Sequence, residues 1–320
     1  MTPRTRGAAL LMSLLTAAVV ATLAATALSR YSHMVEMEST QRQRAQMAWL
    51  LQGALDWARL ILQEDAKANR KESADHLNEP WAMPLQEAKL STFLAAQDES
   101  SGNEVSTEAF LSGYISDAQS RFNLANLRNA ADTDWSAADV AAFIELCEGL
   151  RLDPEVWLQA IERQSLDRQS TASNPGSGGA EGIFKWRLQR IEDLANWGVP
   201  LAHIAALSPH IDWLPKRTPV NVNTASARVL RAAWSGLGPS QAQQVINARA
   251  LKPFTRLQDL QEFAPQLTIQ STRLSTTSDY FWVTGRLRLD ETAIIESSLV
   301  VRDGLNTKVV RRQRQATQIR

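Results

Sequence analysis

The sequence predicts an α+β protein in which a long N-terminal helix precedes an antiparallel sheet, and a large helical block is inserted between strands of that sheet. Three observations predict this order. No Pro or Gly interrupts residues 8–52, and residues 126–270 carry helical periodicity punctuated by caps and turns. Residues 271–315 alternate apolar and polar side chains, as in "DYFWVTGRLRLD", "ETAIIESSLVVRD" and "TKVVRRQRQ".

The composition limits the class of protein. The 320 residues include 34 basic and 34 acidic side chains, and this zero net charge argues against a dedicated nucleic-acid binder. The single cysteine, Cys147 in "AAFIELCEGL", excludes an intrachain disulfide and is predicted to be an inert core thiol. The four histidines show no metal-ligand spacing and no nucleophile motif is present, so we expect no enzyme activity.

The N-terminal helix begins with an uncharged segment, residues 8–29, flanked by Arg6 and Arg30. At a rise of ~1.5 Å per residue this segment spans a hydrocarbon layer of ~30 Å. Arg4 and Arg6 place the N-terminus in the cytoplasm by the positive-inside rule. A cleaved secretory signal with its site at residues 25–27 is the alternative, and it would make the protein a secreted globular one. The unbroken helical pattern favours a retained anchor.

The same helix is predicted to continue to about Asn69, and its second part is amphipathic. Its apolar residues recur at helical spacing and are predicted to pack on the protein's own sheet; they are Met47, Leu50, Leu51, Ala54, Leu55, Ala58 and Leu62. "NEPWAMP" breaks the helix, and "EAFLSGYISDAQSRFNLANL" predicts a strand that enters a helical region. Asp117 and Arg121 are predicted to pair across the turn after this strand, in a structural role.

Two similar segments, "RFNLANLRNA" at 121–130 and "PVNVNTASARVL" at 219–230, each precede a set of short helices. They predict two related helical units. Ser136 and Thr224 are predicted as helix N-caps. The stretch 167–182, "DRQSTASNPGSGGAEG", is predicted to be a loop by its composition.

In "SGLGPSQAQQVI", Gly236 and Gly238 predict a tight turn that opens a helix. The segment 219–260 resembles the helix-hairpin-helix of competence DNA receptors, in which such amides cradle a phosphate. DNA-binding versions place Lys or Arg just after the second glycine, where this chain has the uncharged residues 239–242. A structural hairpin is therefore expected, and a membrane-anchored helix-hairpin-helix DNA-binding protein is the alternative function.

One resemblance covers nearly the whole chain. "RTRG" followed by "AALLMSLLTAAVVATLAATAL" resembles a class III leader, which prepilin peptidase cleaves after glycine. "GYISDAQSRFNLANL", "PVNVNTAS", "FTRLQDL" and "SDYFWVTGRLRL" with "SSLVVRD" are similar to recurrent features of K-type minor pseudopilins. The chain thus resembles the general secretion pathway protein K family of the type II secretion system.

The resemblance implies a pilin-like fold: a long helix and a sheet, with an inserted α-domain of two helical units similar to SAM or helix-hairpin-helix domains. It also divides the chain into segments. These are a prepilin leader at 1–7, a transmembrane helix at 8–29, the periplasmic part of the long helix at 30–69, a pilin-like β region at 70–125 and 271–315, and the inserted α-domain at 126–270.

The function implied is a subunit at the tip of the pseudopilus, which starts filament assembly and aids export of folded proteins across the outer membrane. Cleavage would fall between Gly7 and Ala8, followed by methylation. The implied partners are the I-type and J-type minor pseudopilins, the major pseudopilin and prepilin peptidase, with no nucleic acid. The implied location is the inner membrane, crossed once, with the N-terminus cytoplasmic and the rest periplasmic.

Met12 would be the fifth mature residue, where most pilin-like subunits carry a glutamate that neutralises a neighbouring subunit's amine. A carboxylate in lipid is costly unless it is paired, so a subunit without that neighbour should lack it. No cofactor is expected. Family members sometimes bind calcium near an acidic segment, but the matching region here is "WLQAIERQSLDRQS", where Glu162 and Asp167 lie among basic residues, and no metal ligands are assigned.

Overall fold

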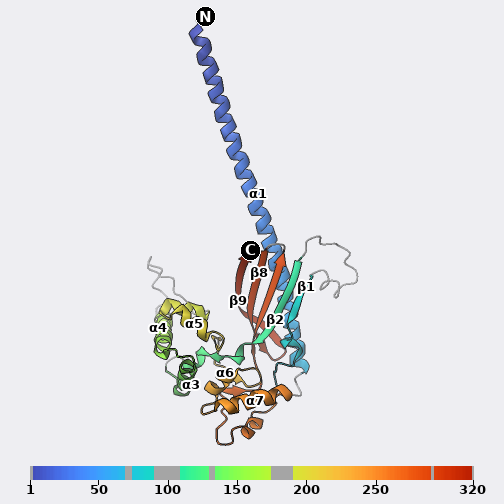
Figure 1. The fold of residues 1–320 in the computed structure, drawn as a ribbon, viewed down its shortest axis with the longest axis vertical. Coiled ribbons are helices and arrows are strands. Elements are labelled where there is room, and N and C mark those ends of the chain that lie inside the picture. Colours follow the sequence, from blue (N-terminus) through green and yellow to red (C-terminus); the bar gives the residue numbers. More distant parts are fainter. Residues whose placement is uncertain are drawn as a thin grey trace. The chain divides into compact units, whose positions relative to one another are not determined.

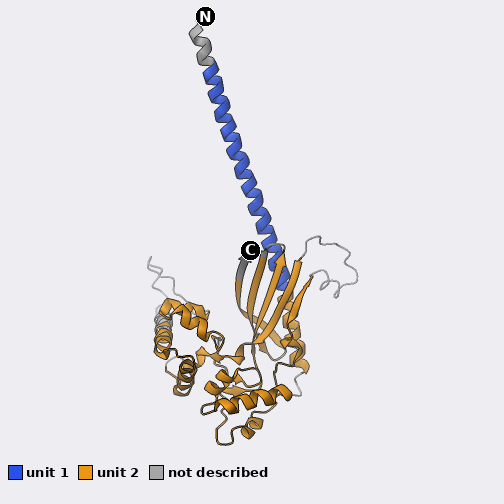
Figure 2. Ribbon diagram, in the orientation of Figure 1, with its two compact units in different colours: residues 1–53 blue, residues 54–320 orange. Residues whose placement is uncertain are grey.

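The computed structural model describes residues 3–68, 74–89, 109–129, 134–173, 190–289 and 292–318, whose order along the chain is shown in Figure 1. The chain forms two compact units, residues 1–53 and 54–320 (Figure 2). Helix α1, Pro3–Ala68, contributes to both. The single long helix expected from the sequence is therefore confirmed over the described residues.

Five strands of the second unit form one antiparallel sheet in the order β1-β2-β7-β8-β9. The strands are β1 (Leu85–Lys89), β2 (Ala109–Asp117), β7 (Tyr280–Leu289), β8 (Thr292–Asp303) and β9 (Asn306–Gln318). Asp117 at the end of β2 lies opposite Phe281 at the start of β7. The helical block is thus inserted between two strands that are neighbours in the sheet, as predicted.

Gly113 is needed because the backbone of β7 lies close to its Cα atom. It lies opposite Gly285, and a Cβ atom on Gly113 would come within 2.6 Å of the Thr284 carbonyl oxygen. Any larger residue would force the two backbones apart. At the other end of the sheet, Gly304 has φ +58° in the turn that joins β8 to β9, a conformation that favours glycine.

The sheet core of the second unit lies against the last turns of α1. The buried apolar residues of this core come from the helix, from the short 3-10 helix η1 (Pro80–Ala82) and from strands β7 and β8; they are Leu55, Ala58, Leu62, Trp81, Phe281, Val283 and Val300. The Trp81 and Phe281 rings meet edge to face with centroids 5.2 Å apart. The predicted packing of the helix stripe on the sheet is confirmed for these α1 residues.

The helical block consists of two units, each closed by a short parallel strand pair. The first contains η2 (Ala118–Ser120), β3 (Phe122–Asn123), η3 (Leu124–Leu127), α3 (Ala137–Glu148), α4 (Pro154–Ser173), η4 (Ile191–Trp197), α5 (Leu201–Leu207) and β4 (Ile211–Asp212). The second contains β5 (Val220–Asn221), α6 (Ala227–Ala233), α7 (Pro239–Leu251), η5 (Leu257–Glu262) and β6 (Leu274–Ser275). Because β3 pairs with β4 as β5 pairs with β6, the structure supports two related units.

Both helical units of the inserted block share one hydrophobic core. In the first unit Phe143 and Trp157 meet edge to face with centroids 6.1 Å apart, and the same buried cluster continues through Val229 and Val245 of the second. Cys147 lies inside this core, and burial raises the pKa of its thiol to about 12. It is therefore an unreactive core thiol, as expected.

Three local expectations were wrong or incomplete. Ser136 holds the N-cap position of α3, but its hydroxyl donates to Asp139 Oδ2 at 2.6 Å instead of accepting from the backbone. Thr224 caps no helix, because α6 begins at Ala227 with Ser226 as its N-cap. The predicted loop at 167–182 is helical as far as Ser173, where α4 ends, and residues 174–182 lie outside the described ranges.

Candidate functional site

The predicted membrane anchor lies in the compact unit formed by residues 1–53. Among the described residues one helix is long and apolar enough to cross a membrane, with a mean hydropathy of 2.1 over its apolar window and none of that window buried. The backbone of Arg4, Arg6, Gly7 and Ala8 belongs to α1. Met12 is 68% exposed on this helix. Cleavage at Gly7 and the membrane orientation set by the arginines stay predictions.

The predicted hairpin turn is present at Gly236 and Gly238. Gly236 has φ +87°, and Gly238 is the N-cap of α7. The Gly238 amide donates to Gln241 Oε1 at 3.0 Å, and Gln241 Nε2 in turn donates to the Phe263 carbonyl at 3.1 Å. The amide that would receive a phosphate in a DNA-binding hairpin therefore already has a partner in this chain.

Two of the cations near this hairpin, Arg249 and Arg256, are also engaged, whereas Lys252 is exposed. Arg249 donates to the Val222 carbonyl at 2.5 Å, and burial lowers the pKa of its guanidinium to about 10. Arg256 pairs with Asp259 at 2.9 Å. Nucleic-acid affinity depends on several cations that are free to neutralise phosphates. This geometry favours a structural hairpin over DNA binding.

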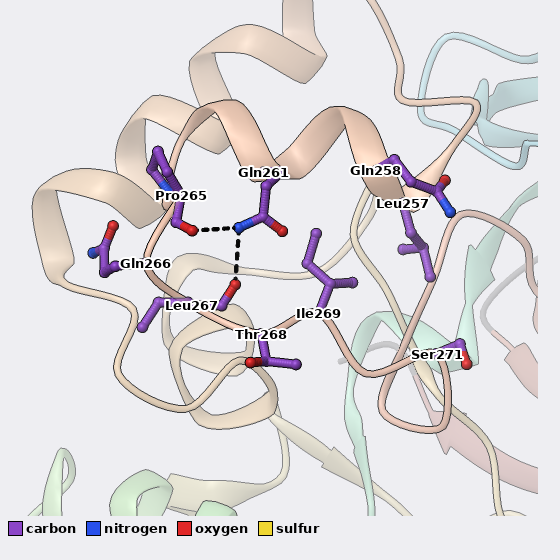
Figure 3. Close-up of a pocket in the computed structure, with 9 residues that line it drawn as sticks. All are labelled: Leu257, Gln258, Gln261, Pro265, Gln266, Leu267, Thr268, Ile269 and Ser271. Atoms are coloured by element: carbon purple, nitrogen blue, oxygen red, sulfur yellow. Dashed lines mark hydrogen bonds between the residues drawn. The ribbon is translucent and has the colours of Figure 1, made fainter.

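A cavity of about 600 Å³ opens beside η5 in the second helical unit (Figure 3). Leu257, Ile269 and uncharged polar side chains line it, and Gln261 Nε2 holds its wall by donating to the Pro265 and Leu267 carbonyls at 2.8 and 3.0 Å. None of its lining residues has an acidic or basic side chain, so the Thr268 and Ser271 hydroxyls have no general base among them.

The motifs that carry the family resemblance converge where the helical block joins the sheet. Asp117 is buried there, and its Oδ2 accepts from Thr224 Oγ1 at 2.5 Å, Ser278 Oγ at 2.6 Å and Asn221 Nδ2 at 3.0 Å. Its Oδ1 accepts from the Gln119 amide at 2.7 Å. Burial raises the pKa of Asp117 to about 6, while these donors oppose that rise. We call these five residues the junction network.

Asn221 is the member that reaches furthest. Its Nδ2 also lies 3.0 Å from the Asp75 carbonyl and 2.9 Å from Ser278 Oγ, and its Oδ1 accepts from the Asn223 amide at 2.9 Å. One buried side chain thus ties β5 of the helical block to the end of β2, to the start of β7 and to the segment that follows α1.

The other asparagines of the two similar segments bind the backbone inside the block. Asn126 and Thr218 exchange two hydrogen bonds of 2.7 and 3.0 Å between side chain and backbone. Asn223 and Phe254 do the same at 2.9 Å each. Sequence reasoning identified these segments but not their partners, which lie 92 and 31 residues away.

A second tie joins the block to the sheet through Asp212. Its Oδ2 accepts from Trp282 Nε1 at 2.6 Å and lies 3.5 Å from Arg121 Nη1, while its Oδ1 lies 3.7 Å from Arg311 Nη2. The predicted pairing of Arg121 with Asp117 was therefore wrong. Arg121 turns to the block because β4 brings Asp212 beside β3, whereas Asp117 already has four donors.

The chain has a pilin-like fold with a large inserted domain. Its long N-terminal helix packs its last turns on the sheet, and the helical block is inserted between the neighbouring strands β2 and β7. Comparison with known proteins agrees. The family model for type II secretion system protein K matches residues 220–283, which include Asn221, Thr224 and Ser278 of the junction network. Over these residues the chain is similar to type II secretion system protein K.

Relatives of that name match along almost the full chain. The Pseudomonas aeruginosa protein is 27% identical over 314 residues, covering 92% of this chain and 88% of its own. The Klebsiella pneumoniae protein is 27% identical over 345 residues, covering 98% and 97%. The Pectobacterium carotovorum protein is 24% identical over 340 residues, with the same coverage of both chains. These relatives are named as secretion-system components.

A solved structure shares the fold. It is one chain in the crystal structure of the GspK-GspI-GspJ complex from the type 2 secretion system of enterotoxigenic Escherichia coli. The likeness has a TM-score of 0.57 at 19% identity and covers 86% of this chain and 98% of that one.

Proposed function

We propose that this protein caps the tip of the type II secretion pseudopilus, starts its assembly and so aids export of folded proteins across the outer membrane. The observation that carries the proposal is Met12. With Ala8 as the first mature residue, the fifth position holds a thioether where most pilin-like subunits carry a carboxylate. Residues 8–29 contain no charged side chain that could take the place of that carboxylate. A subunit at the tip has no neighbour whose amine would need that partner, and an unpaired carboxylate in lipid would be costly.

The inserted block supports the same position. It occupies the chain between Asp117 and Tyr280 and carries its own core, so it adds a second mass to the end of two adjacent strands. Closely stacked pilin-like subunits leave little room for such a mass beneath another subunit. A subunit with nothing above it meets no such limit.

The proposed partners are the I-type and J-type minor pseudopilins, the major pseudopilin and prepilin peptidase. The first two are supported by the solved GspK-GspI-GspJ complex, one chain of which shares the fold of this protein. The proposed location is the inner membrane, with residues 1–7 in the cytoplasm and everything after Arg30 in the periplasm. Arg4 and Arg6 support this orientation.

The test places a carboxylate back at the fifth position. Wild-type protein and the Met12→Glu variant are produced with their partner pseudopilins, and each is located along assembled filaments by labelling. We expect the wild type only at one end and the variant with impaired initiation. Leu15→Glu, which puts the same charge one turn further along α1, is the matched control. Met12→Glu protein in the middle of filaments with no loss of secretion would overturn the tip assignment.

Processing is tested by sequencing the N-terminus of protein extracted from membranes. Ala8 as the first residue supports cleavage by prepilin peptidase after Gly7. Leu28 as the first residue would indicate signal peptidase and a secreted protein without an anchor. A gel-shift series in rising salt addresses the DNA-binding alternative, which the occupied Gly238 amide disfavours. Tight DNA binding that weakens steeply with salt would contradict the interpretation of the hairpin as purely structural.

A further inference from the structure

Three carboxylates are buried together at the end of α1. Asp65 from the last turn of the helix is 7% exposed, and Asp75 and Glu79 from the segment after it are 1% and 4% exposed. Arg302 of β8 reaches into this group, with Nη1 2.8 Å from Asp65 Oδ2 and Nη2 2.5 Å from Asp75 Oδ1. We call these four residues the carboxylate clasp.

One guanidinium faces three carboxylates in this clasp, and Arg302 also stacks over the Phe281 ring at 4.8 Å. Buried like charges close together cannot all ionise without a large free-energy cost. Among the described residues, a proton on one of the three carboxylates would lower this cost near neutral pH.

The hydrogen bonds indicate which carboxylate takes the proton. Asp75 Oδ2 accepts from the Ser278 amide at 2.7 Å. Glu79 Oε2 accepts from the His76 amide at 2.8 Å and from Trp81 Nε1 at 2.6 Å. Such donors stabilise the ionised form of a carboxylate. Asp75 and Glu79 therefore each accept from at least one N–H group outside the clasp.

Asp65 differs from both of them. Arg302 is its donor among the contacts of the described residues, and no backbone amide supports it there. It also lies in the last turn of α1, where the helix dipole disfavours negative charge. Burial, followed by the charge of Glu79, raises the pKa of Asp65 to about 7.

We propose that the clasp is a proton-operated attachment between the end of α1 and the sheet. With a proton on Asp65, the helix end is held to Arg302 and to the segment that carries Asp75 and Glu79. When the proton leaves, repulsion among three carboxylates loosens this attachment. The effect reaches the helical block, because the Asp75 carbonyl accepts from Asn221 and Ser278 contacts both Asp75 and Asp117.

The neighbouring ionisable groups are few enough to separate. Glu79, Asp75 and Arg302 face Asp65 directly, and each comes from a segment packed against it. His76 Nε2 lies 3.9 Å from Glu79 Oε1, and Asp279 lies near Arg302 with its own pKa raised by burial. His76 is the ionisable group outside the clasp that lies against Glu79, so a variant at this position is needed as a control.

The raised pKa of Asp65 determines how the stability of the protein changes with pH. A carboxyl group whose folded-state pKa lies above its unfolded value of 3.8 adds stability that is complete below about pH 4 and is lost as pH rises through about 7. The full chain in detergent micelles should therefore melt about 4–8 °C lower at pH 7.5 than at pH 5.5.

The experiment measures this difference in four proteins: the wild type, Asp65→Asn, Asp56→Asn and His76→Gln. Asp65→Asn should remove most of the difference and leave the smaller part that Asp117 contributes, because its pKa is also raised, to about 6. Asp56→Asn changes an exposed carboxylate of the same helix and should retain it. A full difference in Asp65→Asn, or its loss in His76→Gln, would overturn the proposal.

Hydrogen exchange of residues 61–66 in the wild type gives a second readout that needs no variant. After correction for the intrinsic exchange rate, protection should fall between pH 5.5 and 7.5, and equal protection at both would contradict the clasp. Melting at pH 7.5 is repeated with calcium chloride. A rise in the wild type that is absent in Asp65→Asn would show that a metal ion, and not a proton, balances the site.

Discussion

Replacing Asn221 with alanine should make the helical block unfold at lower urea concentration than the sheet. Asn221 is fully buried at 0% exposure, and its amide nitrogen lies within 3.0 Å of acceptors on Asp75, Asp117 and Ser278. Alanine would remove all of these contacts at once. It would also leave the Asn223 amide without its partner inside the protein.

The magnitude follows from these contacts. A hydrogen bond to a charged group contributes about 1.5–3 kcal/mol and a neutral one about 0.5–1.5 kcal/mol, and a buried group left without a partner costs about 1–3 kcal/mol. Water that enters the vacated space offsets part of this loss. We therefore expect the free energy of unfolding to fall by about 3–5 kcal/mol, which is a large share of the ~5–15 kcal/mol typical of a domain.

The assay is urea unfolding followed by hydrogen exchange in two places, β7 for the sheet and α3 for the block. In the wild type both should unfold together, and in Asn221→Ala the block should lose protection at lower urea than the sheet. Asn247→Ala is the matched control, because Asn247 is exposed and its side chain accepts from Gln243 alone among the described residues. A loss below about 1 kcal/mol, equal to that of the control and with coincident transitions, would refute the role of the junction network.

Three further outcomes follow from single sites. Gly113→Ala should destabilise the sheet by about 2 kcal/mol or more, since its Cβ would lie 2.6 Å from the Thr284 oxygen; an unchanged melting temperature would contradict the close approach. Gln241→Ala should cost about 1 kcal/mol by uncapping Gly238 while DNA retention in a gel shift stays at the wild-type level; enhanced retention would mean that the amide had been masked for phosphate. Cys147 should resist iodoacetamide at pH 8 until urea is added, and rapid labelling of the folded protein would show that the core opens.

The elements with strong local signals could be predicted from the sequence. The uncharged residues 8–29 and the absence of breakers before Gly53 specify α1, and alternation specifies β7 to β9. Gly236 and Gly238 identified the turn before α7 for the same reason, because the backbone conformation there depends on the residues themselves.

The junction could not be predicted in this way. Asp117 and Asn221 are 104 residues apart, and Asp212 and Trp282 are 70 apart, so no periodicity or cap signal links them. Thr224 illustrates the difficulty. Its sequence context fits an N-cap, but its hydroxyl satisfies a buried carboxylate from a distant strand, and the tertiary contact overrides the local preference.

The adjacency of Asp117 and Phe281 in the sheet has a practical consequence. An insertion whose two ends lie side by side can be gained or lost without altering the strands that bear it, because a short hairpin turn bridges the same gap. The helical block therefore leaves the sheet and re-enters it at one place. Excising it, with a tight turn in its place, should leave a smaller subunit of helix and sheet. In that subunit Asp117 would have lost Asn221 and Thr224 as hydrogen-bond donors.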